Sequence, residues 1–194
     1  EGMPHSTFAD YWKSHYTRAI ENQLDVVHVP IVHHNTIGRG RRTLIHGPLV
    51  HHVESDEFQI RIWMQKDDGE TKPFKQGELP DWVSEKTQHL HFIFPNIWQN
   101  YIMDKMRLVA FFAPVDDENT VFYIRVYQSM AKIPPFTWLF FGLYKLFSRI
   151  VAHQDRRVVE TQRPYIAELK SDEILLHGDH PIVHYRKRRD ELKQ

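Results

Sequence analysis

The residues with the clearest chemical potential lie close together near the start of the chain. An amide, a carboxylate and two imidazoles follow one another at Asn22, Asp25, His28 and His33, with a proline between the two histidines. Two neutral imidazoles and one carboxylate form a ligand set that is typical of non-haem Fe(II) sites. The missing carboxylate must come from elsewhere in the chain, and Asp155, in a second polar stretch, is the candidate.

The proline decides whether both imidazoles can reach one metal ion. His28 and His33 are five residues apart, and on an unbroken helix their rings would diverge by roughly 140°. Pro30 disfavours helix at the residue before it and begins a new segment, so a bend is expected directly after His28. Asp25 lies three residues before His28 and stacks on the same side. A carboxylate there can hold the far ring nitrogen of a metal-bound histidine.

Other histidines compete with this assignment. His34 directly follows His33, and the position of the proline does not decide between them. His89 and His91 would share one face of a strand, which makes them a rival metal-binding pair. The pair at residues 51–52 would point to opposite faces and is expected at the surface.

The third ligand also has a competitor. Glu160 lies five residues beyond Asp155 on the same predicted helix, so both carboxylates cannot easily reach one ion. The same three ligands would also suit a hydrolytic zinc site. Asp25 and Asn22 are not explained by a hydrolase, which favours the iron interpretation.

Hydrophobic periodicity indicates a single α+β domain over residues 1–194, with helices packed on one face of a curved antiparallel sheet. A charged segment with glycine and proline, residues 66–86, is expected to be a long loop. The last two strands flank a short polar turn and predict a hairpin. Residues 43–53 are expected to be extended. The strands are predicted at residues 57–64, 88–94, 105–114 and 120–128, and the helices at residues 7–27, 135–151 and 154–169.

Composition excludes several functional classes. The 194-residue chain has 25 Lys and Arg against 25 Asp and Glu, so no global basic field for nucleic acid exists. It has no cysteine, and no signal peptide is visible. The apolar run at residues 133–149 is too short to span a bilayer and contains Lys145 and Arg149. This run predicts a helix that packs on the sheet or lines a pocket. The protein is expected to be cytoplasmic, and peripheral membrane contact of this helix is the alternative.

Two basic clusters, residues 39–42 and 186–189, have two interpretations. Both are expected to be solvated surface. The functional alternative is that they dock an acidic electron-transfer partner or a neighbouring subunit.

The string Asn-x2-Asp-x2-His-x4-His resembles the mononuclear iron site of Rieske-type non-haem iron oxygenases, in their C-terminal catalytic domain. The similarity extends from about Phe8 to the segment at residues 181–186 and includes the Gln-Asp-Arg-x-Val-x-Glu-x-Gln setting of Asp155. It is greatest for the branch with vanillate O-demethylases and pheophorbide a oxygenase-like proteins. A Rieske 2Fe-2S centre needs two cysteines, so this chain is interpreted as the catalytic part of an oxygenase whose N-terminal Rieske domain is absent from it.

The resemblance implies a helix-grip fold and a role for each residue of the motif. His28, His33 and Asp155 would bind mononuclear Fe(II), Asp25 would relay electrons, and Asn22 would lie near the iron. The electrons would come from the Rieske domain of the same or a neighbouring subunit, supplied by a ferredoxin or reductase, in a homotrimer. With O2, an apolar and in particular an aromatic substrate would be hydroxylated or oxidatively demethylated. The alternative is a helix-grip protein that binds hydrophobic ligands without catalysis.

Overall fold

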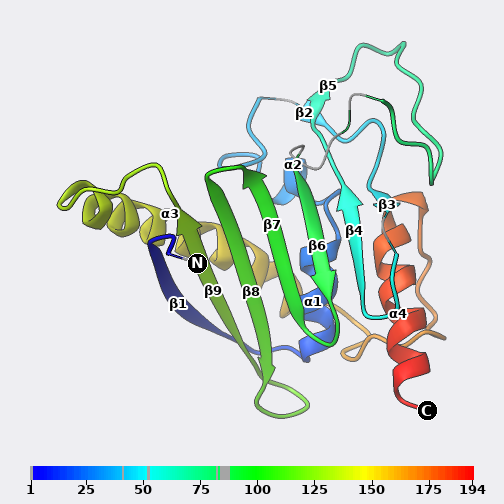
Figure 1. The fold of residues 1–194 in the computed structure, drawn as a ribbon. Helices are drawn as coiled ribbons and strands as arrows, with labels where there is room; N and C mark the ends of the chain where they lie inside the picture. Colours follow the sequence, from blue (N-terminus) through cyan, green and yellow to red (C-terminus); the bar gives the residue numbers. More distant parts are fainter. Residues whose placement is uncertain (1, 41, 52, 82, 84–87) are drawn as a thin grey trace.

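A seven-stranded antiparallel sheet in the order β1-β9-β8-β7-β6-β4-β3 forms the body of the molecule (Figure 1). The computed structural model describes every residue except 1, 41, 52, 82 and 84–87. Two short strands form a separate ladder, β2 (Arg42–Thr43) with β5 (Gln65–Lys66). The sheet strands are β1 (His5–Trp12), β3 (Leu49–His51), β4 (Glu57–Arg61), β6 (His89–Ile93), β7 (Ile97–Met103), β8 (Met106–Pro114) and β9 (Thr120–Gln128).

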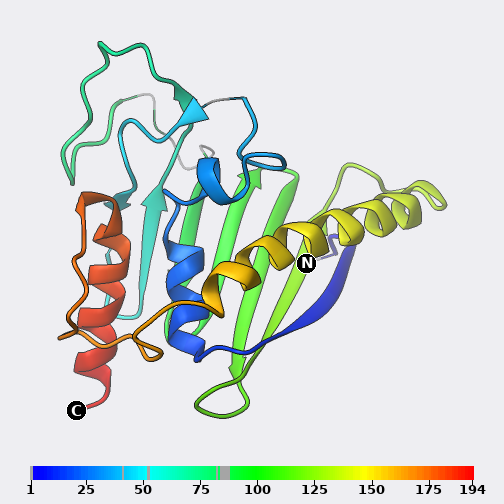
Figure 2. The ribbon, with the colours of Figure 1, turned by 180° about the vertical axis from the view of Figure 1, so that it is seen from behind.

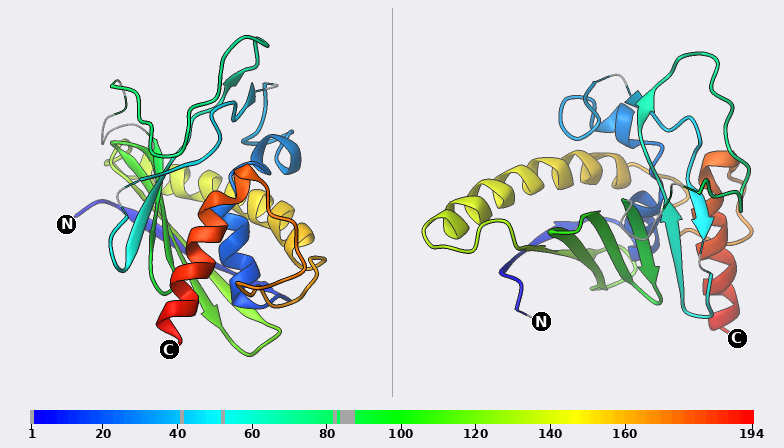
Figure 3. Two further views of the ribbon diagram at one scale, coloured as in Figure 1. Left: turned by 90° about the vertical axis from the view of Figure 1, so that its right-hand side faces the viewer. Right: turned by 45° about the horizontal axis from the view of Figure 1, so that its top comes forward.

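The helices cover one face of this sheet (Figures 2 and 3). Among the described residues these are α1 (Tyr16–Leu24), α2 (Val29–Val32), α3 (Phe136–Val159) and α4 (His180–Leu192), with a 3₁₀ turn at His177–Asp179. A curved antiparallel sheet with helices on one side confirms the expected helix-grip architecture. The β8–β9 hairpin also lies where the sequence predicts it.

The core lies between the sheet and the helices because the strands alternate inward and outward side chains. In β9, Phe122, Ile124 and Val126 are buried, while the residues between them are partly or fully exposed. Trp12, Phe58, Phe92 and Phe112 are also almost inaccessible to solvent. Fully burying one such side chain contributes roughly 1.5–3 kcal/mol, so this inward face stabilises the layer on which α1 and α3 pack.

The prediction of one helix over residues 7–27 is wrong in its first half. Residues 5–12 form β1, an edge strand that pairs antiparallel with β9. Phe8 and Trp12 point inward, whereas Tyr11, which the helical pattern placed on the buried face, is 47% exposed. The helix begins only at Tyr16, after His15, whose side chain accepts a hydrogen bond from the Thr17 backbone. Period-2 and period-3.6 patterns overlap in this short aromatic segment, and pairing with β9 decided between them.

The prediction of two late helices is also wrong. One continuous helix, α3, runs through residues 152–154, and residues 161–176 are irregular. Pro164 lacks a backbone donor, and Ala167 instead donates its backbone N–H to the Thr17 hydroxyl on α1. The sequence patterns also miss α4 and β7. Each carries a polar side chain at an inward position, Arg186 in α4 and Asn100 in β7, which obscures the apolar periodicity.

A buried ionic cluster joins α1 to α4. Arg186 donates to both carboxylate oxygens of Glu21, at 2.6 and 2.9 Å, and to Glu173 at 2.8 Å. Arg18 donates to Glu21 at 3.0 Å and to Glu173 at 2.8 Å. The side chains of Arg18, Glu21 and Arg186 are at most 4% exposed. The interpretation of residues 186–189 as solvated or docking surface is therefore wrong for Arg186. The cluster at residues 39–42 falls partly outside the described residues.

Removing the shared carboxylate is expected to destabilise the fold. Glu21→Gln leaves two buried guanidinium groups with one remaining carboxylate partner, and breaking a buried ion pair in this way costs about 3–5 kcal/mol. Arg188→Gln is the control, because its partners Asp56 and Glu191 are 70% and 62% exposed, and exposed pairs contribute about 0–1 kcal/mol. Urea denaturation measures the free energy of unfolding of each variant and of the wild-type chain. Equal effects of the two substitutions would contradict a structural role for the cluster.

Candidate metal centre

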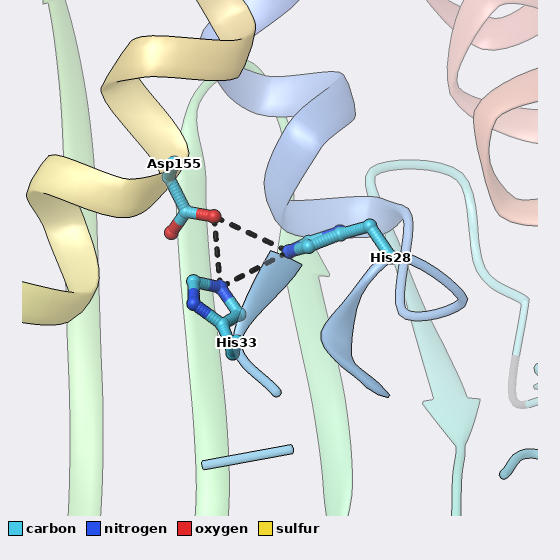
Figure 4. Close-up of side chains that lie close together, drawn as sticks. All are labelled: His28, His33 and Asp155. Atoms are coloured by element: carbon cyan, nitrogen blue, oxygen red, sulfur yellow. Dashed lines mark hydrogen bonds and ion pairs between the residues drawn. The ribbon is translucent and has the colours of Figure 1, made fainter. Parts of the chain in front are cut away.

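Three side chains from distant parts of the chain converge on the helix side of the sheet (Figure 4). His28 precedes the short helix α2 and His33 follows it, with Pro30 in its first turn. The prediction of a bend directly after His28 is wrong, because His28 has helical backbone angles and Val29, the residue before Pro30, already begins α2. The chain changes direction between the end of α1 at Leu24 and His28, and the single turn of α2 leaves both rings facing Asp155 on α3. Asp155, near the end of α3, is 4% exposed and completes the group.

The ligand atoms are spaced as they would be around one ion. His28 Nε2 and His33 Nε2 are 3.3 Å apart, and Asp155 Oδ1 lies 3.2 Å from the first and 2.9 Å from the second. Two ligands about 2.1 Å from an ion and at right angles to one another lie about 3.0 Å apart. Within the described part of the chain, these residues form the one cluster of three potential metal ligands.

A hydrogen-bond network fixes the tautomer of His33. Gln154 Nε2 donates to Asn35 Oδ1 at 2.7 Å, so the Gln154 Oε1 atom is free to accept. It accepts from Thr36 Oγ1 at 2.9 Å and lies 2.8 Å from His33 Nδ1. This network assigns the proton to His33 Nδ1. His33 Nε2 therefore presents a lone pair to the centre, as a metal ligand must.

Asp155 Oδ1 is a buried acceptor that makes no well-aligned hydrogen bond among the described residues, although the Nε2 atoms of His28 and His33 lie 3.2 and 2.9 Å away. His33 Nε2 is close enough, but in the assigned tautomer it has no proton to donate. Asp155 Oδ2, in contrast, accepts a hydrogen bond from Gln23 Nε2 at 3.3 Å. A buried carboxylate oxygen beside two imidazole nitrogens is stabilised by a cation, so the donor set fits a divalent metal ion.

The charges around His28 favour its protonation when no metal is bound. Burial by itself lowers the His28 pKa, but the carboxylates of Asp155 and Asp25 outweigh it and raise that pKa to about 9. Burial raises the pKa of Asp155, and its contacts with His28 and His33 reverse this and hold that pKa well below the usual range. When no metal is bound, a proton on His28 places a positive charge beside Asp155.

Metal affinity is expected to rise with pH because the proton on His28 must leave first. At pH values below the His28 pKa of about 9, lowering the pH by one unit reduces the metal affinity about tenfold, because this one proton must be displaced. Titrating Co(II) into the metal-free chain at pH 7 and pH 8 measures the difference. Affinity that does not change between these values would mean that His28 is already neutral or does not bind the metal.

Asp25 lies beside the far nitrogen of His28, as its spacing predicts. Its Oδ2 atom is 3.6 Å from His28 Nδ1, beyond hydrogen-bond range. Its Oδ1 atom accepts from the backbone N–H groups of Val27 at 2.9 Å and His28 at 3.3 Å. These two bonds hold the turn that carries His28 toward the centre.

The expected position of Asn22 near the metal stays a prediction. Asn22 is 5% exposed, and its Nδ2 atom has no partner among the described residues. It is also not among the residues that line the cavity beside the centre. The amides that do contact the ligands are Gln23 and Gln154. Gln154 could have been suspected from its place next to Asp155, whereas nothing in the spacing singles out Gln23.

The competing residues lie away from the centre. Glu160 follows α3 and its Oε1 atom accepts the backbone N–H of Lys13 at 2.9 Å. His91 pairs with Glu57 at 3.1 Å, and His89 stacks on Tyr101 with ring centroids 4.4 Å apart. His34 is exposed and bonds to the Ile31 carbonyl. In the pair at residues 51–52, His51 pairs with Gln59 in the sheet, and residue 52 lies outside the described residues.

A cavity of about 540 Å³ lies beside the three ligands, between the sheet and α3. His28, His33 and Asp155 form part of its wall, and most of the remaining wall is apolar. Leu90, Trp98, Leu108, Phe122 and Ile124 line it from the sheet, Ile62 from just after β4, and Phe147, Val151 and Ala152 from α3. A small, mainly apolar molecule can thus be held next to a metal ion.

The family model of the vanillate O-demethylase oxygenase C-terminal domain matches residues 12–194. The chain belongs to this family. The match confirms the resemblance drawn from the motif, and it places the chain among the catalytic domains of Rieske oxygenases, a family of non-haem iron oxidoreductases. No curated protein matches the chain closely enough in sequence to serve as a relative.

Solved structures with the same fold come from Rieske oxygenases. The caffeine-bound QL mutant of Pseudomonas putida CBB5 NdmA is similar with a TM-score of 0.68 and 16% identity, over 98% of this chain and 52% of that one. The monooxygenase CntA in complex with L-carnitine has a TM-score of 0.64 and 11% identity, over 100% of this chain and 49% of that one. Carbazole 1,9a-dioxygenase in complex with ferredoxin has a TM-score of 0.64 and 18% identity, over 97% of this chain and 56% of that one. The chain spans about half the length of these proteins.

Proposed function

We propose that this catalytic domain binds mononuclear Fe(II) through His28, His33 and Asp155 and forms part of a terminal oxygenase. The observation that carries the proposal is the convergence of these three ligand atoms at the wall of an apolar cavity. Three protein ligands leave coordination positions free, and iron bound there would supply O2 activation next to the substrate. Hydroxylation or oxidative demethylation of an apolar, aromatic substrate is the proposed outcome.

The chain's own residues have distinct tasks in this proposal. Gln154 orients His33 and fixes its tautomer, and Gln23 holds the second oxygen of Asp155. The apolar cavity wall excludes water and holds the substrate beside the ligands. Asn22 retains its proposed role near the iron only through its position on α1, since no contact supports it.

Asp25 is the proposed route for electrons. It is 30% exposed at the side chain while it touches the His28 ring, so it can contact a partner and a ligand at once. The donor would be a Rieske 2Fe-2S centre on the same or a neighbouring subunit, in a homotrimer, reduced by a ferredoxin or reductase. Mixing the iron-loaded chain with O2 and a chemical reductant tests this dependence. Sustained turnover without any Rieske centre would contradict it.

Two other functions predict different metal requirements. A carrier of hydrophobic ligands is supported by the cavity alone, and it would bind apolar molecules equally well with and without metal. A zinc hydrolase would be active with Zn(II) and inactive with Fe(II). Comparing ligand binding and turnover of the metal-free, Fe(II)-loaded and Zn(II)-loaded chain separates these functions from the oxygenase.

Peripheral membrane contact is the proposed role of the first half of α3. No helix in the described part of the chain is long and apolar enough to cross a membrane. However, this half extends past β1 (Figures 1 and 2), and Trp138, Leu143 and Leu146 are 72%, 61% and 61% exposed. Residues 119–154 contain no acidic side chain, while Lys145 and Arg149 lie on the helix. An apolar helix with basic residues favours an anionic membrane surface.

Sedimentation with phosphatidylglycerol and phosphatidylcholine vesicles tests this contact. The chain is expected to bind the anionic vesicles more tightly, and Trp138→Ser to weaken that binding about tenfold, because an interfacial aromatic anchor is lost. Ile174→Ser is the matched control, since Ile174 is 88% exposed but lies outside α3. Equal binding to both vesicles, or an equal loss in the control, would contradict the proposal.

A further inference from the structure

Two hydroxyl groups on α3 belong to the cavity wall and have no task in the metal centre. Three of the α3 side chains that line the cavity are polar, and they are Tyr144, Ser148 and Asp155. Asp155 is a candidate metal ligand, whereas the other two take no part in that cluster. Tyr144 and Ser148 are four residues apart, so their side chains are neighbours on the helix surface.

Both hydroxyls are open to a ligand. Neither makes a well-aligned hydrogen bond with another described residue, and neither oxygen is among the unpaired atoms that are sealed from solvent. Burial raises the pKa of Tyr144 to about 12, and contact with the Ser148 hydroxyl partly opposes this, so the phenol keeps its proton at neutral pH. A hydroxyl has one donor and two acceptor sites. Even a hydrogen bond between the two would therefore leave one donor and several lone pairs for a ligand.

The hydroxyl pair and the metal centre lie at different points along one face of α3. Ser148 precedes Asp155 by seven residues and Tyr144 precedes it by eleven, which places them about 10 and 16 Å from it along the helix axis. Both spacings return to nearly the same side of the helix at 3.6 residues per turn. Val151 and Ala152 lie between the two sites and also line the cavity. Along α3, the wall therefore runs from a pair of hydroxyls through an apolar stretch to the metal ligands.

We infer that Tyr144 and Ser148 bind the oxygen-bearing end of an elongated substrate, whose apolar far end reaches the metal centre. A single aromatic ring is too short to bridge about 10 Å, so the substrate class is apolar molecules with at least two rings in line and a terminal hydroxyl or carbonyl oxygen. A hydroxyl can donate to one residue and accept from the other, and a carbonyl can accept from both. The cavity of about 540 Å³ has room for such a molecule. The inference rests on the proposed function, and it names the substrate class and the end that faces the metal.

Binding of 4-phenylphenol and biphenyl to the metal-free chain tests the hydroxyl pair. The two probes have the same shape, and only 4-phenylphenol carries an oxygen. Tyr144→Phe and Ser148→Ala are each expected to weaken 4-phenylphenol binding about fivefold, because each removes one hydrogen-bonding group, and to leave biphenyl binding unchanged. Tyr123→Phe is the matched control, since Tyr123 lies between two cavity-lining residues of β9, points to the other face of the sheet and is 41% exposed. Equilibrium dialysis measures all affinities.

Proton relaxation of 4-phenylphenol in the Co(II)-loaded chain tests the orientation. The unsubstituted ring is expected to relax faster than the phenol ring, because it lies nearer to the paramagnetic ion. Combining Tyr144→Phe with Ser148→Ala should reduce this difference, and Tyr123→Phe should preserve it.

Four results would each overturn the inference. These are no binding of 4-phenylphenol to the wild-type chain, equal losses for both probes, a loss in Tyr123→Phe that matches Tyr144→Phe, and faster relaxation of the phenol ring. Circular dichroism identifies any unfolded variant, and each of the two substitutions tests the pair without the other. Metal content is measured separately. Probe discrimination without metal binding would remove the oxygenase proposal and leave the hydroxyl pair as a ligand site, and metal binding without discrimination would remove this inference alone.

Discussion

The wild-type chain is expected to bind about one Fe(II) ion, and His33→Ala and Asp155→Ala are each expected to lose it. Substitutions of residues that only support metal ligands reduce affinity roughly 10–100-fold, so removing a ligand should cost more than this. Both side chains are nearly inaccessible to solvent and their ligand atoms are 2.9 Å apart, which leaves no space for another side chain to replace either one. Anaerobic loading followed by desalting and metal analysis gives the iron content.

The chain offers a matched control for each of these substitutions. His34→Ala removes the adjacent imidazole, which is exposed and bonds only to the Ile31 carbonyl. Glu160→Ala removes a carboxylate just after α3 that contacts the Lys13 backbone. Both controls should retain iron. Iron retained in Asp155→Ala but lost in Glu160→Ala would transfer the third ligand to Glu160, and iron lost in none of the four variants would refute the proposed site.

Asp25→Asn is expected to retain iron but to slow electron delivery about 100-fold. The amide oxygen can still accept the backbone N–H groups of Val27 and His28 that the carboxylate now accepts, so the turn should persist. The negative charge 3.6 Å from His28 Nδ1 is lost, however. A misplacement of about 1 Å at a reacting centre can cost about 10²-fold in rate, and losing the charge that links the partner to His28 is expected to have an effect of this size.

Rapid mixing measures this effect. A reduced Rieske protein is mixed with the iron-loaded chain and O2, and the reappearance of the oxidised cluster spectrum gives the rate. Asp104→Asn, a substitution of the same type in the β7–β8 turn, controls for the change in charge. If Asp25→Asn transfers electrons at the wild-type rate with its iron intact, Asp25 is a structural residue of the turn and not the electron route.

Local sequence determined the β8–β9 hairpin, because its strands alternate on either side of a short polar turn. Local sequence did not determine where the chain bends near the two imidazoles. Pro30 fixes its own backbone angle and is also tolerated in the first turn of a helix, and α2 begins one residue before it, at Val29. The direction change therefore precedes His28.

Residues 5–12 show where local information fails. The pattern of Tyr11 and Trp12 suits a helix as well as a strand, and the ladder to β9, more than 100 residues away, selected the strand. Likewise, α4 is obscured by Arg186, whose inward position makes sense only once Glu21 on α1 is its partner. Such long-range pairs stabilise a conformation that cannot be predicted from hydrophobic periodicity, because the periodicity contains no information about distant partners.

The metal centre required both kinds of information. The motif supplied His28, His33 and the expectation of a distant carboxylate, but spacing alone could not decide between Asp155 and Glu160. That decision depends on the rotation of α3 about its axis as it packs across the sheet. The packing points Asp155 inward and leaves Glu160 bonded to Lys13. The supporting amides of Gln23 and Gln154 are likewise products of tertiary packing.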